Sequence, residues 1–140
     1  MGIHLHCRPL MLAVTASLAM TACTNPAAPT TAAIEGTWNL RNLRPAGGVE
    51  QAKPVGAVYA ITIESGRVAV RADCNTCTGN GTLASSTLTL GPMLACTRAA
   101  CATATFESVF TTMVSGDHTA AISDGSMTLS STRGLIRFER

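Results

Sequence analysis

Apolar and polar residues alternate along most of the chain, which is typical of strands that bury one face. The clearest example is the segment 57–73, which has one break in the alternation, at Ser65-Gly66. A two-residue turn there would pair Ile63 with Val68 and keep all the apolar side chains on one side. The pattern therefore predicts a β-hairpin.

Further strands are expected in 81–90 and on both sides of the Asp124-Gly125 turn signal. The segment 101–116 breaks this rhythm, because its apolar residues recur at helical spacing and Gly116 stands where a helix would end. The apolar residues concerned are Phe106, Val109, Phe110 and Met113. We expect one helix here, stabilised by packing of its apolar face.

Seven or eight short strands with one helix in the C-terminal third predict an α+β fold. The expected architecture is a small antiparallel β-barrel-like sheet whose open end is covered by the helix. All five aromatic residues fall on predicted inward positions: Trp38, Tyr59, Phe106, Phe110 and Phe138. We expect them to form the core, although alternation alone does not distinguish a filled barrel from one with a ligand cavity.

The N-terminal part has the pattern of a secretory signal. A basic start is followed by the apolar run 10–22, which is short for a membrane span and ends in small residues before Cys23. The Ala22-Cys23 junction resembles a bacterial lipobox. We therefore expect a lipoprotein signal peptide over 1–22, a lipidated Cys23 with a flexible tether over 23–33, and a folded domain over 34–140.

The alternative is an ordinary signal cleaved after Ser17-Leu18-Ala19, which would leave Cys23 as an unmodified thiol. Either signal predicts an extracytoplasmic protein, and lipidation predicts membrane attachment through acyl chains. Thr24 stands where an Asp often retains lipoproteins at the inner membrane. In a source with two membranes we expect the periplasmic face of the outer membrane.

The charge pattern excludes several function classes. Removal of Arg8 with the signal leaves nine of the ten basic residues against eight acidic ones, and the arginines are scattered, so no nucleic-acid partner is expected. His118 is the only histidine beyond the signal, and the sequence contains no convincing Ser-His-Asp set. We expect a monomer without enzymatic activity, cofactor or metal.

Four cysteines belong to the expected domain: Cys74, Cys77, Cys96 and Cys101. An even number of cysteines outside the cytoplasm predicts disulfides. A Cys74–Cys77 bridge would close a strained small ring, so bridges from 74/77 to 96/101 are expected. Of the two such pairings, we favour the nested Cys74–Cys101 and Cys77–Cys96 over the crossed Cys74–Cys96 and Cys77–Cys101. Each would stabilise the fold by roughly 3 to 4 kcal/mol without full additivity.

Zinc and redox chemistry remain alternatives for these cysteines. Structural zinc prefers two tight C-x2-C pairs, whereas the second pair here is C-x4-C. A redox C-x-x-C opens a helix, whereas this one runs into Thr78-Gly79-Asn80-Gly81, which is typical of a turn. We expect Asn75 and Gly79 to shape that turn.

Several motifs together resemble the META domain, or HslJ-like, family of bacterial envelope proteins, over roughly residues 34–140. The matching positions are Gly36-Thr37-Trp38, Cys74-Asn75 with Thr78-Gly79, and Thr97 with Cys101. Asp73 and Gly81 depart from the family pattern, which often has Gly and an aromatic residue there. Cys77 and Cys96 resemble the extra cysteines of a lipoprotein subgroup.

The resemblance implies a small β-barrel-like α+β fold, often lipid-anchored, and Gly36, Trp38, Asn75, Gly79 and Thr97 as structural motif residues. The family is named partly after a heat-shock-associated protein and has no agreed activity or cofactor. We therefore expect a non-enzymatic envelope domain, tied to stress tolerance or envelope maintenance, that contacts a protein or the cell wall. The alternatives are a carrier for a small apolar ligand and a redox or metal protein.

Overall fold

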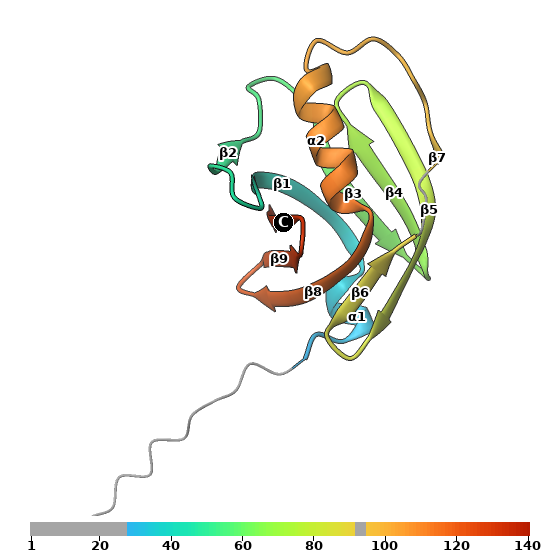
Figure 1. The fold of residues 1–140 in the computed structure, drawn as a ribbon. Helices are drawn as coiled ribbons and strands as arrows, with labels where there is room; N and C mark the ends of the chain where they lie inside the picture. Colours follow the sequence, from blue (N-terminus) through green and yellow to red (C-terminus); the bar gives the residue numbers. More distant parts are fainter. Residues whose placement is uncertain (1–27, 92–94) are drawn as a thin grey trace, which may run out of the picture.

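The computed structural model describes residues 28–91 and 95–140, which form a β-barrel with two helices (Figure 1). The helices are α1 (Thr31–Ile34) and α2 (Ala104–Val114). The strands are β1 (Gly36–Pro45), β2 (Gln51–Ala52), β3 (Tyr59–Glu64), β4 (Arg67–Ala72), β5 (Asn75–Ala84), β6 (Thr87–Leu90), β7 (Ala95–Cys96), β8 (Gly116–Ser123), β9 (Ser126–Ser131) and β10 (Gly134–Glu139).

Eight of the strands close into an antiparallel barrel in the order β10-β9-β8-β6-β5-β4-β3-β1, and pairing of β1 with β10 completes the ring. The short strands β2 and β7 pair with β1 and β5 outside this ring. The expected α+β barrel with a helix in the C-terminal third is thus confirmed. Closure removes the exposed edges that an open sheet of this size would present.

The predicted hairpin is confirmed in its register. In the β3–β4 pair, Ile63 lies opposite Val68 and Glu64 lies opposite Arg67. The Asp124-Gly125 turn likewise joins β8 to β9 and pairs Ile122 with Met127. In these segments alternation and turn residues agree, so local sequence was enough to define the pairing.

The turn expected at Thr78-Gly79-Asn80-Gly81 is wrong, because these residues lie inside β5. Two neighbouring strands hold β5 extended: β4 pairs with 75–80, and β6 pairs with 81–84. A Cβ on Gly81 would lie 2.6 Å from the Val68 side chain, so this glycine permits close packing rather than a turn. The chain reverses instead at Asp73, which has a positive φ of 56°.

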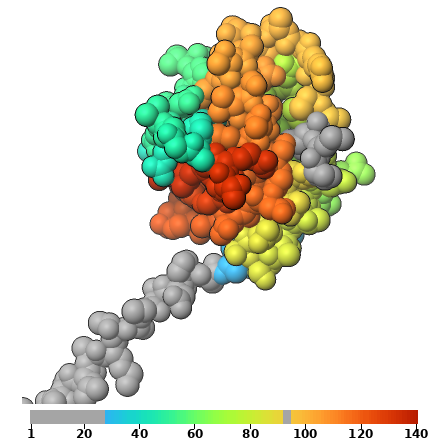
Figure 2. Space-filling view, in the orientation of Figure 1, coloured from blue at the N-terminus to red at the C-terminus, as the bar shows by residue number. Residues whose placement is uncertain are grey.

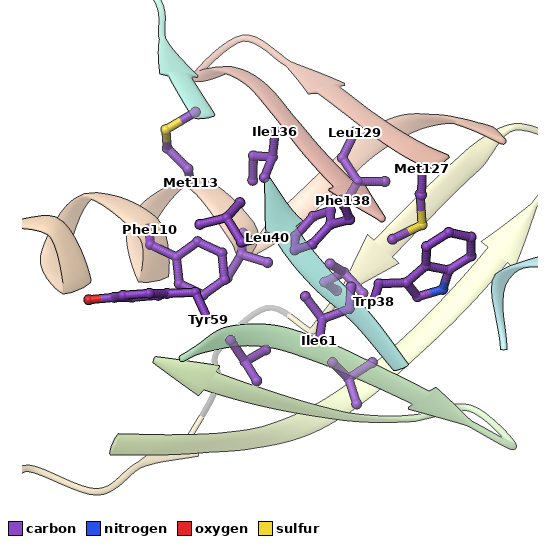
Figure 3. Close-up of a cluster of buried hydrophobic side chains, with 14 of the residues drawn as sticks. Trp38, Leu40, Tyr59, Ile61, Phe110, Met113, Met127, Leu129, Ile136 and Phe138 are labelled. Atoms are coloured by element: carbon purple, nitrogen blue, oxygen red, sulfur yellow. The ribbon is translucent and has the colours of Figure 1, made fainter. Parts of the chain in front are cut away.

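Inward side chains fill the barrel (Figure 3). Trp38 lies at one end of the core, and Tyr59 and Phe110 lie together at the other, with aliphatic residues such as Ile61 and Leu129 between them. Tyr59 makes edge-to-face ring contacts with Phe106 and Phe110, with centroids 4.9 and 5.1 Å apart. The inward placement of all five aromatic residues is confirmed.

Helix α2 lies over the barrel opening, with Phe110, Met113 and Val114 buried and with contacts to β1, β4 and β10 (Figure 1). Helix α1 begins at Thr31, so the last part of the tether expected over 23–33 is folded instead. The Thr30 side chain caps this helix by accepting from the Ala33 amide. In 28–91 and 95–140, neither helix has the length and apolarity needed to cross a membrane.

Candidate functional site

Two disulfides fasten one segment to the barrel at the turn between β4 and β5. Cys74 is bonded to Cys101 and Cys77 to Cys96, which is the nested pairing that the sequence favoured. We call residues 96–101 the stapled loop. After β7 the chain runs over the surface along the upper right of the molecule before it enters α2 (Figures 1 and 2).

The Asn75 side chain supports the stapled loop from beneath. Asn75 is 2% exposed, and its Nδ2 donates to the carbonyl oxygen of Ala99 at 3.0 Å. Its Oδ1 accepts from the Ala99 amide at 2.7 Å and from the Thr97 hydroxyl at 2.9 Å. One buried carboxamide thereby fixes both backbone groups of Ala99, which is how a loop without regular structure satisfies its polar groups.

The same carboxamide connects the stapled loop to α2. Asn75 Nδ2 lies 2.8 Å from Glu107 Oε1 in the first turn of the helix and 3.1 Å from the Cys101 sulfur. Beside it, the Thr103 hydroxyl donates to Asp73 at 2.6 Å and lies 2.6 Å from the Tyr59 hydroxyl. The loop, the β4–β5 turn and the start of α2 therefore share one hydrogen-bond network.

The electrostatics of this network favour a neutral Tyr59. Burial raises the pKa of the Tyr59 hydroxyl, the hydrogen bond to Thr103 lowers it, and the charges of Asp73 and Glu107 raise it further. A phenol with a raised pKa remains a hydrogen-bond donor at neutral pH. The arrangement is suited to holding the loop.

The outer side of the stapled loop is open to solvent. Residues 95–100 are all exposed, and none of residues 96–101 has a positive φ. Arg98 lies between Thr97 and Ala99, both of which are held by Asn75. Within the part of the chain that the structure describes, the Arg98 side chain makes no hydrogen bond or ion pair. A fixed backbone thus presents a free guanidinium.

His118 is the second buried polar residue among those described, with 2% exposure. Its Nε2 lies 3.0 Å from the Val114 carbonyl oxygen at the end of α2, whereas Nδ1 is buried without a partner. Burial lowers the pKa of this imidazole, the bond to Val114 raises it, and the charge of Arg133 lowers it while that of Asp117 raises it. The neutral form is favoured.

Two family-motif residues lie at the other end of the barrel. Gly36 links α1 to β1 with a φ of 106°, which only glycine adopts without strain. The Trp38 indole is fully buried and donates to the Ile34 carbonyl oxygen at 2.8 Å. The Arg140 guanidinium lies over the Trp38 ring, 3.9 Å from its centroid.

The motif residues thus divide into three places. Asn75 and Thr97 meet at the stapled loop, Gly36 and Trp38 lie near α1, and Gly79 is a strand residue opposite Val68. The expectation that Asn75 and Gly79 shape a turn is wrong, since Asn75 begins β5 and supports the loop. Sequence reasoning also missed the partners of the network, which lie far away in sequence: Tyr59, Ala99, Thr103 and Glu107.

The structure describes the groups on which the metal, redox and ligand alternatives depend. All four domain cysteines are in disulfides, and no three His, Cys, Asp or Glu residues in the described ranges lie close enough to hold a metal. One hollow of about 660 Å³ lies among polar residues such as Asp117, Thr119 and Ser130, and a smaller one of about 350 Å³ lies beside Val109 and Met113 of α2. Side chains of the core occupy the barrel interior. The expected lipidation site Cys23 and the signal peptide lie outside the described residues.

Comparisons with known proteins support the fold and leave the activity open. The model of the META domain family matches residues 30–140. An NMR structure of a protein from Burkholderia xenovorans has 22% identity and a TM-score of 0.67, over 97% of this chain and 98% of that one. A second NMR structure has 17% identity and a TM-score of 0.57, over 75% and 88%. No curated protein matches the chain.

Proposed function

The chain belongs to the META domain family, and from this premise we propose that it is a non-enzymatic, lipid-anchored domain of the bacterial envelope that acts by contacting another envelope component. The observation that carries the proposal is the pair of disulfides Cys74–Cys101 and Cys77–Cys96. Structural disulfides persist in oxidising compartments outside the cytoplasm. Stress tolerance and envelope maintenance are the roles suggested by the family resemblance.

The distribution of contacts supports a binding role. The barrel interior is occupied by side chains, and the polar network around Asn75 is directed at holding the stapled loop. A rigid exposed loop suits recognition better than turnover, because preorganisation reduces the entropy lost on binding. The domain begins at α1, a few residues after Cys23, at the barrel end opposite the β4–β5 turn (Figure 1). An anchor at Cys23 would leave the stapled loop facing away from it.

The experiment for the anchor is metabolic labelling with a fatty acid in cells that express the full chain. We expect label on the wild-type protein and on Cys7→Ser, the matched control in the signal segment, but none on Cys23→Ser. The C23S protein should also leave the membrane fraction on lysis. Label that survives in C23S, or a wild-type protein that is soluble in the cytoplasm with free thiols, would refute the proposal.

A further inference from the structure

We propose that the stapled loop is a substrate-like inhibitory loop for trypsin-like serine proteases, with Arg98 as the residue that enters the specificity pocket. This deepens the proposed function by naming a partner. It rests on the non-enzymatic, protein-binding part of that function and does not need the lipid anchor. The partner is identified by chemistry, since a trypsin-like pocket has a carboxylate at its base and binds arginine or lysine.

The first argument is presentation of the side chain. A protease pocket can receive only a side chain that is exposed and not bound within its own protein. Arg98 meets both conditions, as do the strand residues Arg44 and Arg67, but only Arg98 lies on the stapled loop. By contrast, Arg137 is paired with Glu50 and Arg140 with Trp38. The free guanidinium is complementary in charge and shape to a buried carboxylate, which it can bind in a bidentate geometry.

The second argument is rigidity on both sides of Arg98. Toward the N-terminus, the Thr97 amide donates to the Thr76 carbonyl oxygen at 3.0 Å, and the Thr97 hydroxyl is bonded to Asn75. Toward the C-terminus, the Ala99 amide and carbonyl are both bonded to Asn75. A flexible arginine segment would be a substrate, whereas a segment held before binding loses little entropy and dissociates slowly.

The third argument is that both ends of the loop are fastened covalently. Hydrolysis of the Arg98–Ala99 bond adds one water, which supplies the hydroxyl of the new Arg98 carboxyl group and the proton of the new Ala99 amine. The two new ends would stay in place, because Cys96 is bonded to Cys77, and Cys101 to Cys74. Cleavage would therefore release no product, and the protease could re-form the bond between the two ends held in place.

The test uses the full protein, purified from the envelope with its disulfides intact, and trypsin assayed with a small chromogenic arginine substrate. We expect competitive inhibition with a dissociation constant below micromolar, in the range of stable protease complexes. Arg98→Ala should weaken inhibition at least roughly 100-fold, the loss expected for an arginine hot spot, and Arg98→Lys should retain most of it. Arg67→Ala, an exposed arginine at the far turn of the β3–β4 hairpin, is the matched control and should inhibit as wild type.

A second variant tests the role of rigidity. Thr97→Val removes the hydroxyl contacts to Asn75 and to the Thr76 amide without altering Arg98. We expect inhibition about 10-fold weaker and faster cleavage at Arg98–Ala99, seen by mass spectrometry after reduction, because the loop loses two hydrogen bonds that order it before binding.

Three results would overturn the inference: no inhibition by the wild-type protein at micromolar concentration, rapid cleavage with no inhibition, or equal inhibition by R98A. None of these results would affect the anchor. Conversely, absence of lipid on the wild-type protein would overturn the anchor. If the C23S protein still inhibited trypsin as the wild type does, the inhibitory loop would stand.

Discussion

The two ends of the barrel each hold a segment that lies outside the barrel, and they do so by different means. At the β4–β5 turn, the stapled loop is held by two disulfides and by the buried Asn75. At the other end, α1 is held without covalent bonds, by the Trp38 indole and by Arg140, which donates to the carbonyl oxygens of Ala33 and Glu35. Figure 3 places aromatic side chains at both ends of the core.

The two ends differ in how the backbone entropy lost on ordering each segment is offset. Helix α1 has backbone hydrogen bonds of its own, such as Glu35 to Thr31, so noncovalent contacts from Trp38 and Arg140 are enough to dock it. Beyond the bond from the Thr97 amide to Thr76, the stapled loop has no backbone hydrogen bonds to a helix or strand among the described residues, so each fixed residue loses roughly 1 to 2 kcal/mol of backbone entropy without that compensation. The two disulfides and the buried, fully hydrogen-bonded side chain of Asn75 offset this loss of entropy.

The largest effect is expected for Asn75→Ala. The substitution leaves the Ala99 amide and carbonyl without their partner beneath the loop, which should lower the free energy of unfolding by about 2 kcal/mol. Urea denaturation of oxidised protein measures it. Asn80→Ala, an exposed position on the same strand, is the control and should change stability by less than about 0.5 kcal/mol. Equal effects of the two substitutions would contradict the central role of Asn75.

An intermediate effect is expected on acidification, through His118. Because burial holds the folded pKa below its ordinary value of 6.5, the unfolded chain binds the proton first as pH falls. The stabilising contribution is therefore complete above pH 6.5 and declines toward the folded pKa, by up to about 1.4 kcal/mol per pH unit.

Denaturation curves between pH 7.5 and 5 measure this dependence, with His118→Gln as the comparison. The variant should be less stable at neutral pH, but its free energy of unfolding should change less between pH 7.5 and 5, because Gln does not titrate. A wild-type slope that persists in H118Q would assign the dependence to another group. Since His118 lies against the end of α2, between the two barrel ends, its slope should be the same with the Arg140→Ala substitution.

The smallest effect is expected for Arg140→Ala. It removes the stacked guanidinium over Trp38 and the two bonds to α1 carbonyls, all at an exposed position, and should cost about 1 kcal/mol. The emission of Trp38, the single tryptophan, reports the change directly. Arg137→Ala, which breaks an exposed pair with Glu50, is the control and should leave the emission unchanged. An emission change of the same size in R137A would mean that the α1 end is not held as described.

The local parts of this protein could be predicted from the amino-acid sequence. The β3–β4 hairpin, the Asp124-Gly125 turn and helix α2 were all predictable, since each depends on neighbours a few residues apart. Parity and spacing of the cysteines led to the nested disulfides. The META family motifs led to the barrel class, and the matched residues 30–140 agree with it.

Barrel closure and the course of β5 depend on tertiary contacts between distant parts of the chain. Closure joins β1 to β10, some hundred residues later, so no local pattern contains it. Pairing on both sides keeps β5 extended through Gly79 and Gly81 against their turn propensity, and this turns Asn75 inward beneath Ala99. The function of such a residue depends on which distant backbone it meets, and that is fixed by packing of the whole barrel.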